Sequence, residues 1–320
     1  MTCTSFEIAG DHKEERRPMQ LRASGGSGLY MSSIGVSLEG QFGYDQAFQK
    51  MHNLLATAVQ NGVTHFDLSP HYGPPYGAAE ENFGQLARTL PCHREELVVS
   101  TRSGLGTQPG PLVGFGSRKR LLSSLNATLR RTGLEYVDVF YAHRHDPLTP
   151  IEETASALDA AVRQGKALYA GLSGYSPAIA SKVSDLLRDL GTPVAAYRVT
   201  YSMLNRWPEY GLLPLLEQEG FGCVVEGALD FKRSSSTHLS EAELGRFWGC
   251  LSNVAAHRGQ SSTQCALSWV LRRPVVTSAL TTPSSSRELL KYCAAAGQTR
   301  FTDSDISAID RCIPDQEFLR

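Results

Sequence analysis

The sequence predicts a single-domain (β/α)₈ barrel, the α/β fold in which eight parallel strands alternate with helices. Eight short runs rich in β-branched and aromatic residues are spread along the 320 residues, which is typical of buried strands. Amphipathic helical segments fill the gaps between these runs, and each strand with its helix recurs at a spacing of about 30 residues. Eight such units favour a closed barrel over an open doubly wound sheet.

The expected strands follow one another in chain order at 33–38 (SIGVSL), 63–67 (VTHFD), 97–102 (LVVSTR), 136–141, 167–172, 193–199, 221–226 and 275–280. The expected helices fill the gaps at 45–61, 78–90, 117–132, 151–164, 176–190, 210–219, 240–257 with 261–272, and 284–296. Glycines in the segment 21–31 (LRASGGSGLYM) favour a hairpin turn. Residues 1–18 are charged and aperiodic, so we expect a flexible tail before a barrel that occupies residues 19–320.

Charge and cysteine content exclude several classes of protein. The 31 basic and 32 acidic residues nearly cancel, which argues against binding to nucleic acid or to an anionic membrane surface. No stretch approaches the roughly 20 apolar residues of a membrane helix, and the amino terminus is too polar for a signal peptide, so we expect a cytoplasmic protein. The seven cysteines are scattered without a C-x-x-C pair, which predicts reduced and mostly buried thiols and no metal site.

Polar residues gather at the carboxyl ends of the expected strands. In a (β/α)₈ barrel these ends form the active-site face. They carry Ser37, Glu39, Asp67, Tyr72, Arg102, His143, Ser173, Arg198 and Glu226.

Four long segments share their pattern with one enzyme family: FDLSPHYGPPYGAAEENFGQLA, GSRKRLLSSLNATLRRTGLEYVDVFYAHRHD, TPIEETASALDAAVRQGKALYAGLS and RGQSSTQCALSWVLR. Over about residues 20–312 the chain resembles the aldo-keto reductases, in particular the branch that contains the glyceraldehyde-phosphate reductases and the potassium-channel β subunits. The resemblance implies a barrel that acts on a small carbonyl compound. The sequence gives no indication of the oligomeric state.

Reduction in that family uses an Asp, a Tyr, a Lys and a His, and three of these positions match Asp67, Tyr72 and His143. The resemblance implies that Tyr72 exchanges a proton with the substrate oxygen, that His143 orients the carbonyl, and that Asp67 holds the cation that tunes the phenol. Arg102 stands at the lysine position, where it keeps the positive charge but cannot relay a proton. A purely structural ion pair between Asp67 and Arg102 is the alternative.

The positions that bind the nicotinamide cofactor in the family are altered in this chain. Ser173 is retained but a glycine follows it, and Arg198 replaces a glutamine on the sixth of the eight strands. Gly227 and Leu229 stand in the loop after the seventh strand, where the family has Ser-Pro-Leu, and Ser284 alone survives after the eighth. Capping of a helix by serine is the alternative role for Ser284. Three or four lost hydrogen bonds, at roughly 1.5–3 kcal/mol each, would weaken cofactor binding by about four decades or more.

Two further residues are candidates for contact with the substrate. Glu39 stands where the family has a tryptophan after the first strand, and a carboxylate facing Tyr72 and His143 is a candidate acid or base. An exposed loop glutamate is the alternative. Arg198 is a candidate clamp for a phosphate or a substrate carboxylate.

These departures lead us to expect redox-neutral acid–base chemistry on a small carbonyl compound, by a dehydratase, isomerase or cyclase that works through an enol or enolate without any nicotinamide cofactor. The first alternative is an aldehyde or ketone reductase that depends on NADP(H) and has a rebuilt cofactor site. The second alternative is a non-catalytic binding subunit, as in the channel branch of the family.

Overall fold

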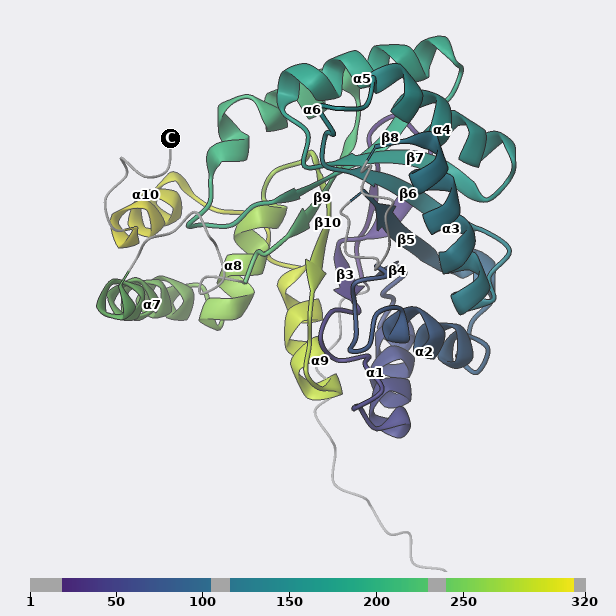
Figure 1. Cartoon of the computed structure of the whole chain (residues 1–320). Helices are drawn as coiled ribbons and strands as arrows, with labels where there is room; N and C mark the ends of the chain where they lie inside the picture. Colours follow the sequence, from purple (N-terminus) through teal and green to yellow (C-terminus); the bar gives the residue numbers. More distant parts are fainter. Residues whose placement is uncertain (1–18, 105–115, 230–239, 314–320) are drawn as a thin grey trace, which may run out of the picture.

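Eight parallel strands close into a barrel in the order β10-β3-β4-β5-β6-β7-β8-β9. The computed structural model describes residues 19–104, 116–229 and 240–313. The barrel strands lie at the centre of the molecule with the helices around them (Figure 1). They are β3 (Ile34–Ser37), β4 (His65–Asp67), β5 (Val98–Ser103), β6 (Val137–His143), β7 (Ala167–Ser173), β8 (Val194–Thr200), β9 (Gly222–Glu226) and β10 (Val276–Thr281). The predicted fold class and all eight predicted strands are confirmed.

Helices follow the strands and cover the outside of the barrel. They are α1 (Phe48–Gln60), α2 (Ala78–Ala87), α3 (Arg118–Thr132), α4 (Ile151–Arg163), α5 (Pro177–Asp189), α6 (Leu212–Glu219), α7 (Glu241–His257), α8 (Ser262–Leu271), α9 (Ser286–Ala295) and α10 (Asp303–Cys312). Two short 3₁₀ helices, η1 (Arg94–Glu96) and η2 (Trp207–Tyr210), complete the set. Serines begin several of these helices: the hydroxyl groups of Ser117, Ser176 and Ser240 accept hydrogen bonds from backbone N–H groups in the first turn.

The helix α10 was not expected from the sequence. Its first turn contains two aspartates, and only one face of the helix carries apolar residues. A capping box was present as a signal, because Thr302 and Asp305 satisfy each other's backbone N–H groups at its start. The helix was not predicted because most of its residues are polar.

The predicted hairpin is confirmed as β1 (Leu21–Ala23) paired antiparallel with β2 (Tyr30–Ser32). It closes the amino-terminal end of the barrel. The Arg22 guanidinium donates to the Val276 carbonyl at 2.7 Å, and the Ser24 hydroxyl donates to the Ala195 carbonyl at 2.8 Å. Met31 packs with the apolar residues inside the barrel. Because this end is closed, the opposite end is the one open to ligands.

Alternate side chains of each strand point into the barrel. The larger part of the apolar core lies between the strands and the helices, and a smaller cluster fills the barrel interior near the hairpin. At the carboxyl ends the inward positions become polar, with Asp67 on β4, Arg102 on β5, His143 on β6, Ser173 on β7, Arg198 on β8 and Glu226 on β9. The parallel register sets His143 beside Ser173 and Ser173 beside Arg198.

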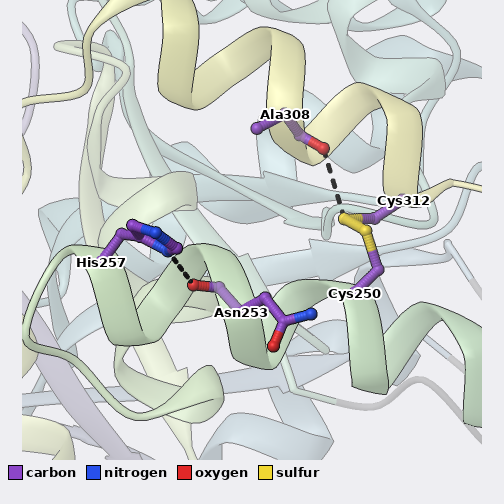
Figure 2. Close-up of a disulfide and its surroundings, with 5 residues drawn as sticks. All are labelled: Cys250, Asn253, His257, Ala308 and Cys312. Carbon is purple, nitrogen blue, oxygen red and sulfur yellow. Dashed lines mark hydrogen bonds between the residues drawn. A yellow bond between two sulfur atoms is a disulfide. The ribbon is translucent and has the colours of Figure 1, made fainter.

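A disulfide joins Cys250 of α7 to Cys312 of α10, 62 residues apart in the sequence (Figure 2). The expectation of seven reduced thiols is therefore wrong for this pair. The two helices lie side by side, which brings together cysteines whose spacing gave no sign of pairing (Figure 1). Of the other described cysteines, Cys223 and Cys265 are buried thiols, as expected.

Within the described ranges, none of the helices has both the length and the apolar character needed to cross a membrane. The expected tail at 1–18 lies outside the described residues.

Candidate active site

Tyr72 lies in the loop between β4 and α2, with its phenol turned back toward the end of β4. The hydroxyl donates a hydrogen bond to Asp67 Oδ2 at 3.0 Å. The other carboxylate oxygen, Oδ1, accepts from the Ser100 hydroxyl at 2.8 Å. Tyr72 is 3% exposed and Asp67 is fully buried, so a single phenol and a single carboxylate share a site shielded from water.

Arg198 is the cation in contact with this pair. Its Nη2 atom donates to the Tyr72 hydroxyl at 3.1 Å and lies 3.2 Å from Asp67 Oδ2. The same atom lies 2.5 Å from Glu226 Oε2. Because Arg198 is 1% exposed and touches two carboxylates, its charge is fully compensated within the site.

Arg102 takes a different position from the one the family resemblance implied. Its guanidinium lies over the ring of Tyr72, 5.1 Å from the centroid, and does not bond the hydroxyl. Its Nη1 atom is 3.7 Å from Asp67 and 3.9 Å from Glu226, beyond hydrogen-bond distance. A planar guanidinium is broader than an ammonium and can lie over an aromatic ring. Thus Arg198, and not Arg102, meets the phenol oxygen.

Burial and the neighbouring Asp67 carboxylate raise the pKa of Tyr72 well above its ordinary value, although the charge of Arg198 acts in the opposite direction. Against the effect of burial, the carboxylates of Asp67 and Glu226 raise the pKa of Arg198. At neutral pH the site therefore holds a protonated phenol beside a charged arginine. A phenol in this state is a proton donor.

His143 ends β6 and faces the same end of the barrel. Burial lowers its pKa to about 4, so the imidazole is neutral at physiological pH. Its Nδ1 atom lies 2.9 Å from the hydroxyl of Ser173 on the next strand. That contact fixes the ring and leaves Nε2 for another partner.

A buried histidine that the sequence analysis did not single out, His65, is linked to Asp67 through the hydroxyl of Ser100. His65 Nε2 lies 3.1 Å from the Ser100 hydroxyl, and Nδ1 lies 2.9 Å from the Ser278 hydroxyl. Since Ser100 donates its only proton to Asp67, it must accept from Nε2–H, and Nδ1 then accepts from Ser278. Burial lowers the pKa of His65 to about 4. The signal was available, because His65 and Asp67 are two residues apart on one strand and so face the same side.

A cavity of about 880 Å³ opens at the carboxyl ends of the strands beside this cluster. Its size lies within the range of small-molecule and cofactor sites. It is lined by Ser37, Glu39, Gly40, Gln41, Arg144, Arg198, Thr200, Asn205, Trp207, Glu226, Gly227, Ala228, Leu229, Leu280, Thr281, Thr282 and Tyr292.

The remaining predicted site residues are placed as follows. Glu39 is exposed at the cavity and is not part of the cluster around Tyr72. Gly227 and Leu229 line the cavity. Ser284 is committed to the start of α9, where its backbone N–H and its hydroxyl both donate to Glu288 Oε2 at 2.7 Å. The serine that caps α9 is Ser285, whose hydroxyl accepts from the Glu288 N–H, so Ser284 contacts the first turn of the helix without being its cap.

The sequence profile described as the Aldo/keto reductase family matches residues 35–314. The chain belongs to this family. This aldo/keto reductase is 41% identical over 325 residues to the L-glyceraldehyde 3-phosphate reductase of Escherichia coli K12, with 93% of this chain and 94% of that protein covered. It is 30% identical over 290 residues to a probable voltage-gated potassium channel subunit beta of Arabidopsis thaliana, with 82% and 87% covered. Among solved structures, it resembles a thermostable aldo-keto reductase in complex with the inhibitor epalrestat, with a TM-score of 0.74, 26% identity and coverage of 92% of this chain and 100% of that one.

These relationships correct two expectations. The family match and the 41% identity to a named reductase across nearly the whole chain support a reductase, so the redox-neutral dehydratase, isomerase or cyclase hypothesis is wrong. The expectation of no cofactor is wrong for the same reason. The hypothesis counted the missing amide and basic side chains and gave too little weight to the groups that replace them. Arg198 is one such group, and it lines the cavity.

The donors around the cavity fit a nicotinamide dinucleotide. The Ser37 hydroxyl and the Nε and Nη1 atoms of Arg198 are buried without a hydrogen-bond partner in the structure. Buried donors without partners are rare in folded proteins and are explained when a ligand supplies the acceptor. A carboxamide or carbonyl oxygen at the cavity floor would supply such an acceptor.

Proposed function

We propose that this aldo/keto reductase uses NADP(H) to reduce a small aldehyde or ketone. The observation that carries the proposal is the Tyr72 hydroxyl held between the Asp67 carboxylate and the Arg198 guanidinium. The similarity to the Escherichia coli L-glyceraldehyde 3-phosphate reductase supports the same reaction type, because the substrate in that name is an aldehyde. Action in the cytoplasm stays a prediction from the sequence.

NADP(H) would bind along the cavity, with Ser37 and Arg198 at the nicotinamide end and Tyr292 toward the other end. Ser173 does not line this cavity, and its hydroxyl contacts His143. When bound, the reduced cofactor supplies the hydride for the carbonyl carbon. The chain's own residues then have to bind the substrate oxygen, donate a proton to it and stabilise the charge left behind.

Tyr72 is the proton donor in this proposal. Its raised pKa keeps the phenol protonated at neutral pH, so the proton is present when the carbonyl oxygen gains negative charge. Arg198 Nη2, 3.1 Å from the phenol oxygen, remains protonated and stabilises the phenolate that forms. Arg102 adds positive charge over the ring.

His143 orients the carbonyl. When the Ser173 hydroxyl donates to Nδ1, the neutral imidazole carries its proton on Nε2. The Nε2–H group then donates a hydrogen bond to the substrate oxygen, and the proton stays on His143. Because the pKa of His143 is about 4, this hydrogen bond is available across neutral pH.

The test is consumption of NADPH by the purified chain with a panel of small aldehydes, beginning with glyceraldehyde 3-phosphate and glyceraldehyde. Tyr72→Phe should lower kcat by about 10²- to 10⁴-fold. Tyr44→Phe is the matched control, since it removes an exposed phenol hydroxyl that contacts Glu81 and does not line the cavity. Absence of NADPH consumption with every aldehyde, or full turnover by Tyr72→Phe, would contradict the proposal.

A further inference from the structure

Arg144 has an unusual backbone conformation next to the candidate active site. It directly follows His143, and with φ of 66° it is the one non-glycine residue with positive φ among residues 19–104, 116–229 and 240–313. Side chains other than glycine adopt this conformation at an energetic cost, and such residues cluster at functional sites. The position that this backbone conformation gives to the Arg144 side chain is therefore worth relating to function.

Neighbouring groups hold Arg144 in place. Its backbone N–H donates to the Ser173 carbonyl at 2.6 Å. Its stem lies against Gly174, where an added Cβ would come within 3.0 Å of Arg144 Cγ. The glycine at this position thus leaves room for the arginine side chain, which lines the cavity.

The charge of Arg144 is uncompensated, in contrast to the other arginines of the site. Arg198 lies against Asp67 and Glu226, and Arg102 lies within 4 Å of the same two carboxylates. Arg144 is exposed at the cavity, and no described residue accepts a hydrogen bond from its guanidinium or pairs with its charge. A cation without a protein partner at a ligand cavity is a binding group for an anion.

We propose that Arg144 binds an anionic group of the substrate, so that the preferred substrates are short carbonyl compounds carrying a phosphate or a carboxylate. This inference rests on the proposed reductase function and assigns its substrate class. Because Arg144 and His143 are consecutive, the anionic group and the carbonyl oxygen are held by neighbouring residues. Only a few bonds then separate the two groups in the substrate.

The kinetic test compares two matched substrate pairs: glyceraldehyde 3-phosphate with glyceraldehyde, and succinic semialdehyde with butyraldehyde. The wild type should prefer the anionic member of at least one pair, and the pair that shows the preference identifies the phosphate or the carboxylate. Arg144→Met should lower the anionic-to-neutral ratio of kcat/KM by about 10- to 100-fold, mainly through KM. Arg144→Lys should retain part of the preference, because it keeps the charge without the planar fork. Arg311→Met, on the exposed face of α10, is the charge control and should leave the ratio unchanged.

Calorimetry of glycerol 3-phosphate binding, with glycerol as its neutral counterpart and NADPH present, separates this inference from the reductase function. If glycerol 3-phosphate binds only when Arg144 is present, while the chain reduces no aldehyde, the reductase function is rejected and the anion site is supported. An unchanged ratio in Arg144→Met, with aldehydes still reduced, would overturn the anion site and leave the function standing. Weaker binding of NADPH to Arg144→Met, with unchanged KM for the anion, would also overturn it, because Arg144 would then belong to the cofactor site.

Discussion

Removal of the Arg198 guanidinium should destabilise the fold far more than removal of the Arg102 guanidinium. Arg198 lies 2.5 Å from Glu226 and 3.2 Å from Asp67, and Asp67 is fully buried. Among the described residues, Arg198→Met leaves the buried Asp67 carboxylate with only the Arg102 guanidinium nearby, 3.7 Å away and beyond hydrogen-bond distance. Breaking a buried ion pair in this way costs about 3–5 kcal/mol.

Arg102→Met removes much weaker contacts. The distances of 3.7 Å and 3.9 Å exceed those of hydrogen bonds, and the side chain is 14% exposed. The stacking on the ring of Tyr72 accounts for most of its effect, about 1 kcal/mol. The two variants therefore differ by about 2–4 kcal/mol, although each loses one arginine at the same site.

Urea unfolding at neutral pH, followed by circular dichroism, measures this difference. Arg163→Met, which breaks an exposed ion pair with Asp159, is the control and should change the free energy of unfolding by less than about 1 kcal/mol. Combining Arg198→Met with Glu226→Gln should recover part of the loss, because one carboxylate is then neutral. Equal losses for Arg198→Met and Arg102→Met would refute the assignment of Arg198 as the cation that compensates Asp67.

Two further predictions concern stability. Acid should weaken the fold through His65, whose pKa is about 4 in the folded chain and about 6.5 in the unfolded chain. As the pH falls, the unfolded chain takes up the proton first. The free energy of unfolding is therefore highest above pH 6.5 and falls by about 3 kcal/mol as the pH drops to 4. Urea titrations over this range should show a shallower slope for His65→Gln, and an unchanged slope would contradict the buried neutral state. Cys250→Ser should lower the free energy of unfolding by about 4 kcal/mol, because the disulfide closes a loop of 62 residues. A reducing agent should lower the free energy of unfolding of the wild type by the same amount and leave that of the variant unchanged. A wild type whose free energy of unfolding is insensitive to reduction would contradict the pairing with Cys312.

Most of the barrel follows from sequence periodicity. The eight strands lie in short segments rich in β-branched and aromatic residues that are almost entirely buried, as expected for strands covered on both faces, and most helices show a clear apolar stripe. The helix α10 also has an apolar face, but most of its residues are polar, so the pattern was overlooked. The disulfide could not be predicted at all, since a pair 62 residues apart depends on how two helices pack.

The site was only partly predictable. Asp67 and His143 stand at strand ends, and Tyr72 follows five residues after Asp67, so the fold rule placed all three at one face. The partner of the phenol depends on distances across the barrel, which a linear sequence does not give. Arg198 and Arg102 both end on the inner face, and only the structure distinguishes the one at the hydroxyl from the one on the ring.

The error about the reaction had a related cause. Missing side chains can be counted in a sequence, whereas contacts made by their replacements cannot. Arg198, which stands where the family has a glutamine, forms an ion pair with Glu226 at the cavity. A site with altered residues was therefore mistaken for one that had lost its cofactor.

Transfer of deuterium from 4-deuterated NADPH to the substrate carbon tests the central claim most directly. The aldehyde that gives the highest turnover is incubated with the labelled cofactor, and the product alcohol is analysed by mass spectrometry. A reductase with Tyr72 as its proton donor predicts one deuterium on carbon and no product when NADPH is omitted. Product formed without NADPH, or carbon-bound deuterium that comes only from D₂O, would contradict it.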